Sequence, residues 1–183
     1  MKLVKSYQSE IPEFSNYGNQ LIAQKERSKG RFKNFVRREM AFKKNMAKLI
    51  GKEAVDFTGV DLEGNEISLS DFKGKITVVD FWATWCGPCK AEFPAYKELE
   101  EKYGEEINFV SVGAFCSEDD WREMATDEGF MHNIFLSKEA AQQIAPYEVN
   151  SIPRYLVINE NFELIDADAP RPSSGELEAY WVK

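Results

Sequence analysis

Residues 81–90 read Phe-Trp-Ala-Thr-Trp-Cys-Gly-Pro-Cys-Lys and contain two cysteines, Cys86 and Cys89, separated by two residues. An apolar, β-branched run at residues 76–81 precedes this stretch, and a run of helix-forming residues follows it. The order predicts a strand that ends before the first cysteine and a helix that begins there. Cys86 is therefore expected at a helix N-terminus, with Cys89 one turn further along the same face.

That position has a chemical consequence for Cys86. Free N–H groups and the partial positive charge of a helix N-terminus favour a thiolate, so we expect a lowered pKa and a raised reactivity. Cys89 can close a small disulfide ring with it. Gly87 leaves room for the backbone of a partner, and Pro88 in the first helical turn costs no hydrogen bond. The interpretation requires Cys86 to be open to solvent and within bonding reach of Cys89.

The alternative for the same cysteines is half of a zinc site. Cys116 and His132 would complete a set of four ligands, but they lie 16 positions apart. The second ligand pair of a structural zinc site is usually closely spaced. The strand–CxxC–helix context favours redox chemistry, and we expect no metal.

Several stretches of the chain resemble one known family. Residues 85–89 resemble the active site of the thioredoxin superfamily, and residues 56–58, 61–64, 69–75 and 79–85 resemble its TlpA/ResA-like branch. The resemblance covers about residues 51–183. It implies an α/β thioredoxin-like fold, in which helices flank a central mixed sheet that is preceded by a β-hairpin. It also implies a thiol–disulfide oxidoreductase that needs no cofactor, because two thiols carry the electrons.

Four residues are expected to be catalytic. Cys86 would attack a partner disulfide and form a mixed disulfide, which Cys89 would resolve. Asp80 lies in an otherwise apolar strand, where burial should raise its pKa and suit it to accept the Cys89 proton; thioredoxins carry a buried acid there. Glu92, three residues after Cys89, resembles a glutamate that tunes the cysteines of ResA-like proteins. The alternatives are an inert, hydrogen-bonded Asp80 and a solvated Glu92, and either acid could carry the proton.

A second group is expected to contact the partner protein: Trp85, Gly87, Pro88, Ile152 and Pro153. Residues 151–153 resemble the cis-proline loop of the superfamily, whose backbone pairs with an extended partner segment. A trans proline at a strand start is the alternative. Arg154, where thioredoxins often have threonine, could shape the choice of partner. Trp82 is expected to pack beneath the loop.

The rest of the chain predicts further elements. Strands are expected at about 55–60, 67–69, 107–112, 133–136, 155–158 and 162–167, and helices at about 117–128 and 138–144. The pattern Ser173-x-x-Glu176 matches a capping box and predicts a last helix that extends to about residue 182. Cys116 is expected to be either an inert, buried thiol or a third redox thiol, and His132 to be a surface or packing residue.

Charge divides the chain into two parts. Residues 1–52 hold 13 Lys and Arg against 4 Asp and Glu, whereas residues 53–183 hold 10 against 27. We expect a basic helical extension at residues 1–50, divided near Gly30, and a thioredoxin-like domain at 51–183. Packing of the extension on its own acidic domain or on a second subunit is favoured over nucleic acid or an anionic membrane surface.

The cellular compartment of the protein and the direction of electron flow are predicted mainly from the resemblance. No run reaches the ~18 apolar residues of a membrane helix, and the start has no signal-peptide run. This suits a cytosolic protein or a trimmed mature form, whereas the resemblance implies the periplasm or the envelope. The Gly87-Pro88 dipeptide resembles reducing members, so we expect reduction of protein disulfides with electrons from an upstream thiol protein. The alternatives are an oxidase or isomerase, a thiol peroxidase, and a metal-carrying or adaptor module.

Overall fold

The computed structural model describes residues 29–182 of the chain, with side chains from residue 33 onward. The chain divides into two compact units, Met1–Asn45 and Met46–Lys183. Most of helix α3, Lys29–Met46, belongs to the first unit and carries Lys43 and Lys44 in its last turn. The part of the helical extension predicted before residue 29 lies outside the described residues, and the separate role of residues 1–50 stays a prediction. No helix in the described part of the chain is long and apolar enough to cross a membrane.

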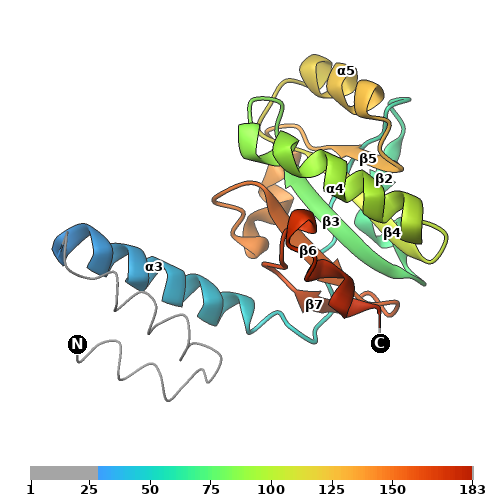
Figure 1. The fold of residues 1–183 in the computed structure, drawn as a ribbon. Coiled ribbons are helices and arrows are strands. Elements are labelled where there is room, and N and C mark those ends of the chain that lie inside the picture. Colours follow the sequence, from blue (N-terminus) through green and yellow to red (C-terminus); the bar gives the residue numbers. More distant parts are fainter. Residues whose placement is uncertain (1–28, 183) are drawn as a thin grey trace. The chain divides into compact units, whose positions relative to one another are not determined.

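The second unit is built on a mixed sheet, in which the described residues form seven strands in the order β2-β1-β5-β4-β3-β6-β7 (Figure 1). The strands are β1 Thr58–Val60, β2 Glu66–Ser68, β3 Ile76–Trp82, β4 Ile107–Gly113, β5 His132–Phe135, β6 Arg154–Ile158 and β7 Leu164–Asp166. Strands β3, β4 and β5 run parallel, while β1–β2, β1–β5, β3–β6 and β6–β7 are antiparallel. The predicted thioredoxin-like mixed sheet with its opening hairpin is confirmed.

The side chains of β3 point alternately to the two faces of the sheet, and this alternation determines which of them lie under the helices. Val78 and Trp82 belong to one buried cluster with Cys89 and Phe93 of α4, Gly87–Tyr103, and with Trp121 of α5, Glu118–Glu128. Side chains two apart along a strand point to the same face. Residue 80 therefore also faces α4, on the central strand of the sheet.

The two α-helices of this unit end as the sequence predicts. Ser117 caps α5 by accepting a hydrogen bond from the Asp120 N–H, and Gly129 ends it in the left-handed conformation at φ 66°. Gly104 follows α4 and donates to the Glu100 carbonyl. Short 3-10 turns complete the unit: η1 Leu69–Phe72, η2 Ala140–Tyr147, η3 Pro172–Ser174 and η4 Leu177–Tyr180.

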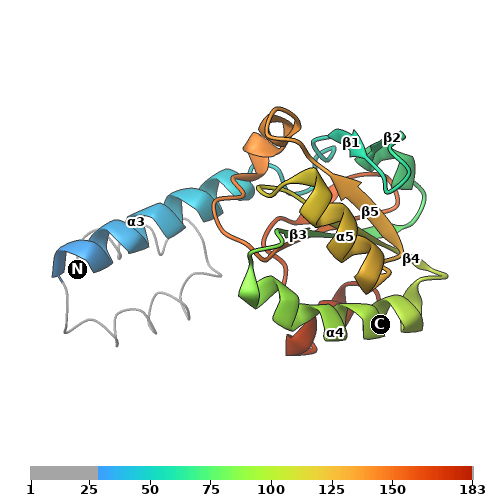
Figure 2. The same ribbon diagram turned by 90° about the horizontal axis from the view of Figure 1, so that it is seen from above.

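Two segments that were predicted to be helices form 3-10 turns instead. The helix expected at 138–144 is the 3-10 turn η2, which contains Pro146, a residue with no N–H to donate. The helix expected at 173–182 is broken into η3 and η4 by Gly175 at φ 73°. Ser173 makes no capping box, because its N–H and hydroxyl both donate to Glu92 instead. The C-terminal segment thus lies beside α4, as Figures 1 and 2 both show.

Candidate active site

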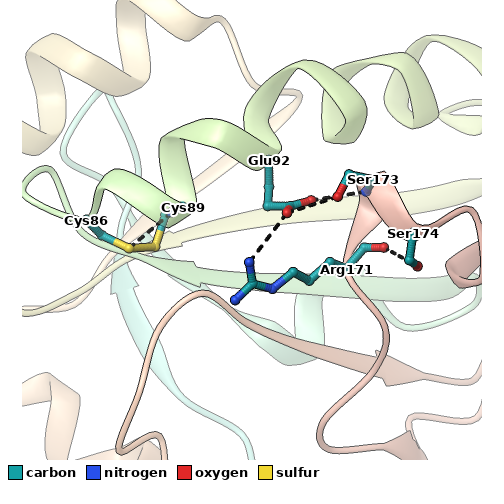
Figure 3. Close-up of polar contacts among 6 residues, drawn as sticks. All are labelled: Cys86, Cys89, Glu92, Arg171, Ser173 and Ser174. Carbon is teal, nitrogen blue, oxygen red and sulfur yellow. Dashed lines mark hydrogen bonds and ion pairs between the residues drawn. A yellow bond between two sulfur atoms is a disulfide. The ribbon is translucent and has the colours of Figure 1, made fainter.

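The two cysteines lie at the N-terminus of α4, where the sequence places them. Cys86 is the N-cap residue of the helix, and its Sγ accepts a hydrogen bond from the Cys89 N–H at 3.2 Å. Pro88 occupies the first turn. Cys86 and Cys89 are joined by a disulfide (Figure 3), so the predicted bonding reach is confirmed.

Access to the disulfide is narrower than the sequence suggests. Cys86 is only 3% exposed and Cys89 is fully buried, so the expectation of an open Cys86 is wrong for the disulfide form. The reason is that the sulfur is bonded on one side and capped by a helical N–H on the other. Gly87 and Pro88 beside it are exposed, and a Cβ on Gly87 would meet nothing within 4 Å. An incoming sulfur can therefore approach over Gly87.

Asp80 lies beneath α4 and is 1% exposed. Burial raises its pKa well above the ordinary value, and the nearby carboxylates of Glu92 and Glu100 add to the effect. The Tyr155 hydroxyl is close enough to oppose this shift, but neither it nor the Asp80 oxygens have the geometry of a hydrogen bond. Asp80 is therefore a buried acid with a raised pKa next to the Tyr155 hydroxyl, and its catalytic role stays a prediction.

Glu92 is also buried, at 5% exposed, so the solvated alternative is wrong. Its two carboxylate oxygens accept hydrogen bonds from the Ser173 N–H and Oγ, each at 3.0 Å. Arg171 Nη1 lies 3.6 Å from one of them (Figure 3). Because three donors from the segment before and within η3 surround Glu92, its charge is held in one place, on the α4 turn that follows Cys89.

Sequence reasoning missed three members of this acidic region. Arg171 and Ser173 are 79 and 81 positions from Glu92, and the only local pattern at Ser173 has the spacing of a capping box. Glu100 lies two turns beyond Glu92 on α4, is 7% exposed, and accepts a hydrogen bond from the Met131 N–H at 3.2 Å. Burial raises the pKa of Glu100 to about 7. Its spacing of eight from Glu92 is the one sequence signal that could have placed it on the same face.

The predicted proline loop is present. The Ile152–Pro153 peptide bond is cis, as the resemblance implies. Ile152 packs against the buried cluster that contains both cysteines. Arg154 differs from expectation: it is 8% exposed and directed inward, with Nη1 3.2 Å from Asp168 Oδ1 and 3.4 Å from the Ala167 carbonyl. It is therefore anchored in the fold and does not present its charge to a partner.

The two tryptophans have opposite environments. Trp82 is fully buried and donates through Nε1 to Ser111 Oγ at 2.7 Å, which confirms the predicted packing role. Trp85 is 65% exposed, and its Nε1 donates to the Phe115 carbonyl at 2.8 Å. The exposed indole next to Cys86 is thus fixed to the loop that follows β4.

The remaining zinc candidates, Cys116 and His132, are both half-buried. Burial raises the pKa of the Cys116 thiol. The ring centroid of His132 lies 4.8 Å from that of Phe72, and burial lowers the pKa of His132. Within the described residues, no group of three or more His, Cys, Asp or Glu side chains is arranged to hold a metal.

Comparison with known proteins agrees with this geometry. The model of the Redoxin family matches residues 49–179. The thiol-disulfide oxidoreductase ResA of Bacillus thuringiensis is 31% identical over 135 residues, which cover 73% of this chain and 78% of that protein. The thioredoxin-like protein YneN of Bacillus subtilis is 33% identical over 70% of this chain and 76% of its own length. A crystal structure of a proposed thiol-disulfide oxidoreductase from Bacteroides vulgatus superposes with a TM-score of 0.66 at 36% identity, covering 73% and 96% of the two chains.

Proposed function

Since this chain belongs to the redoxin family and is a thiol–disulfide oxidoreductase, we propose that it reduces disulfides in other proteins by a Cys86/Cys89 cycle. The observation that carries the proposal is the cysteine pair at the N-terminus of α4 with an uncommitted buried acid on the strand beneath. We assign the catalytic roles to Cys86, Cys89 and Asp80, and partner contact to Trp85, Gly87, Pro88, Ile152 and Pro153.

The first step uses Cys86 in the reduced protein. The Cys89 N–H and the N-terminal end of α4 favour its thiolate. The thiolate attacks one sulfur of the partner's disulfide, so that a Cys86–partner S–S bond forms and the partner's own S–S bond breaks. The leaving partner sulfur takes the electron pair and then a proton. Gly87 and Pro88 line the open side of this approach.

The second step requires a deprotonated Cys89. Cys89 is fully buried, and an apolar environment disfavours a thiolate, so a nearby base accelerates the step. We assign the proton to Asp80, because burial raises its pKa and its oxygens have no hydrogen-bond partner. The Cys89 thiolate then attacks Cys86 Sγ, forms the internal disulfide and releases the second partner thiol. The partner gains two electrons and the enzyme loses two.

Glu92 has a different role in this scheme. Its oxygens are already engaged by Ser173 and Arg171, so it is poorly placed to exchange a proton at each turnover. We propose that it is a positioning residue, whose fixed negative charge raises the pKa of Asp80. An upstream thiol protein would return the electrons to the pair, and the resemblance of the Gly87-Pro88 dipeptide to reducing members supports this direction. We further propose, on the same resemblance, that the exchange occurs in the cell envelope.

Trapping with Cys89→Ser tests the cycle most directly. Without the resolving thiol, Cys86 should accumulate as a stable mixed disulfide with its protein substrates, which diagonal electrophoresis and mass spectrometry would identify. Cys86→Ser is the matched control and should trap nothing. Peroxide consumption that survives Cys89→Ser would contradict the proposal and favour a thiol peroxidase.

The direction of electron flow has its own measurement. Equilibration of the Cys86–Cys89 pair with glutathione buffers gives its reduction potential. A value near or below that of cellular dithiol reductants, about −270 mV for thioredoxin, agrees with net reduction. A strongly oxidising value, near about −120 mV, would make the protein an oxidase and overturn that part of the proposal.

A further inference from the structure

A pocket beside the redox site has no role in the exchange chemistry. It has a volume of about 470 Å3 and lies where the loop after β4 meets η2. We call it the Phe115 pocket, and its lining residues are Phe115, Cys116, Lys138, Ala141 and Gln142. None of them belongs to the cysteine motif or to the acids beneath α4.

Two contacts connect the Phe115 pocket to the redox loop. The Trp85 indole N–H donates to the Phe115 carbonyl at 2.8 Å. The Cys116 thiol lies against Thr84. Thr84 and Trp85 are the two residues immediately before Cys86, so a polypeptide that bonds to Cys86 and continues past Trp85 meets the pocket next.

The wall of the pocket is exposed and apolar. Phe115 is 48% exposed, and Trp85 beside it is 65% exposed. Phe115 also has a φ of 62°, a left-handed conformation that is unfavourable for a bulky side chain and that the surrounding structure must enforce. Two exposed aromatic residues that are joined by a hydrogen bond, one of them in a strained backbone conformation, are features of a binding surface more than of a core.

The lining residues indicate the chemistry of the occupant. The Phe115 ring, the Ala141 methyl group and the protonated Cys116 thiol suit an apolar side chain. Lys138 supplies a cation in a domain dominated by Asp and Glu, and among the described residues it forms no ion pair. An acidic residue beside the apolar one would therefore be attracted, since opposite charges at the rim of a site improve recognition.

We propose that the Phe115 pocket binds the substrate polypeptide itself, through an apolar side chain a few residues from the reactive cysteine and an adjacent acidic residue that faces Lys138. The inference rests on the proposed reduction of protein disulfides and adds substrate selection to it. The pocket takes no part in bond making or breaking. It lowers the concentration at which a suitable polypeptide places its disulfide over Cys86.

Synthetic peptides joined by a disulfide to glutathione test this selection. One series carries Leu-Asp near the cysteine, and the matched series carries Ser-Lys at the same positions. The neutral small molecule hydroxyethyl disulfide, which has neither an apolar side chain nor an acidic group for the pocket, is the reference substrate. The full chain is pre-reduced, and kcat/KM is measured for each substrate.

Phe115→Asn removes the ring but keeps a residue that tolerates the left-handed conformation. It should lower kcat/KM for the Leu-Asp peptide by about tenfold, the loss expected for one buried apolar side chain. Lys138→Glu should lower it by about threefold, as expected for an exposed ion pair. Lys52→Glu, an exposed lysine outside the pocket lining, is the charge-matched control and should leave it unchanged. Reduction of hydroxyethyl disulfide should be the same in all variants, which also shows that each variant folds.

The outcomes separate the two proposals. If Phe115→Asn slows the small disulfide as much as the peptide, or if wild type reduces Leu-Asp and Ser-Lys peptides equally well, the pocket proposal is overturned while disulfide reduction stands. If wild type reduces the small disulfide but no peptide or protein disulfide, the proposed reduction of proteins fails and the pocket proposal fails with it.

Discussion

The two sides of the Cys86–Cys89 disulfide reverse the usual distribution of side chains, in which charged groups are exposed and apolar groups are buried. The inner side, beneath α4, buries the acids Asp80, Glu92 and Glu100. The outer side exposes the rings of Trp85 and Phe115. Charge in a low-dielectric interior shifts pKa values strongly, and apolar surface in water favours association. The contrast supports the proposed division between proton chemistry on the inner side and partner recognition on the outer side.

The largest effect should come from Asp80→Asn on the inner side. Without its base, Cys89 should resolve mixed disulfides about 100-fold more slowly at pH 7, within the usual range for loss of an acid–base group. Peptides and hydroxyethyl disulfide should be slowed alike, whereas the outer-side variants affect peptides alone. Stopped-flow measurement of the resolution step checks this, with the exposed Asp127→Asn as control. If Asp80→Asn slowed the reduction of peptides but not of hydroxyethyl disulfide, the proposed difference between the two sides would be wrong.

Asp80→Asn should also change the dependence of stability on pH. The pKa of Asp80 is raised in the folded protein, so the folded state binds more protons and stability falls as pH rises above the unfolded pKa of about 3.9. The amide of the Asp80→Asn variant does not ionise, so this pH-dependent loss of stability disappears. The variant should be more stable than wild type at pH 7 and equal to it near pH 3 in urea titrations, because only wild type has a proton to lose at this buried site.

Ser173→Ala sharpens the account of how Glu92 is held. It deletes the 3.0 Å hydrogen bond from Oγ and keeps the one from the backbone. Because a hydrogen bond to a charged group is lost, the free energy of unfolding should fall by about 1.5–3 kcal/mol. Ser174→Ala, whose hydroxyl contacts the Arg171 carbonyl and not Glu92, should cost less than about 1 kcal/mol. Equal costs for the two variants would mean that the Glu92 contacts contribute no special stability.

Glu100→Gln should have the smallest effect, because Glu100 contributes least of the groups that raise the pKa of Asp80. The pKa of Glu100 rises from 4.5 to about 7 on folding, so its contribution to stability declines as pH rises from 4.5 to 7. Glutamine can still accept the Met131 N–H and has no proton to lose. The variant should become more stable than wild type across that window, by an amount on the order of 1 kcal/mol. A gain below pH 4 would contradict the assignment.

The chemistry of the central region was predictable because its signals are local. An apolar run, two cysteines and a helix-forming run place Cys86, Cys89 and Asp80 on one strand–helix unit. The caps at Ser117 and Gly129 follow from short-range hydrogen bonds in the same way. In each case the interaction that determines the structure lies within a few residues.

The predictions were wrong where a residue far away in the sequence binds a side chain whose role had been predicted from its neighbours. Ser173 has the spacing of a capping box, but the buried Glu92 carboxylate offers a stronger acceptor than the helix end. Arg154 stands in a loop position that suggested partner contact, and Asp168 draws it inward. Neither Glu92 nor Asp168 is near its partner in sequence, so no local pattern could have indicated the choice.

Residue order alone predicted the class of reaction, the cysteine pair and the strand–helix unit that carries it, because these features depend on residues close together in the chain. Only the tertiary structure showed that Ser173 and Arg171 bind Glu92 and that the Asp80 oxygens lack hydrogen-bond geometry. It also showed that Cys86 is buried in the disulfide form and that a pocket lies next to Trp85. These properties depend on which segments far apart in the chain pack together, and only the folded sheet and its helices bring them within a few ångströms.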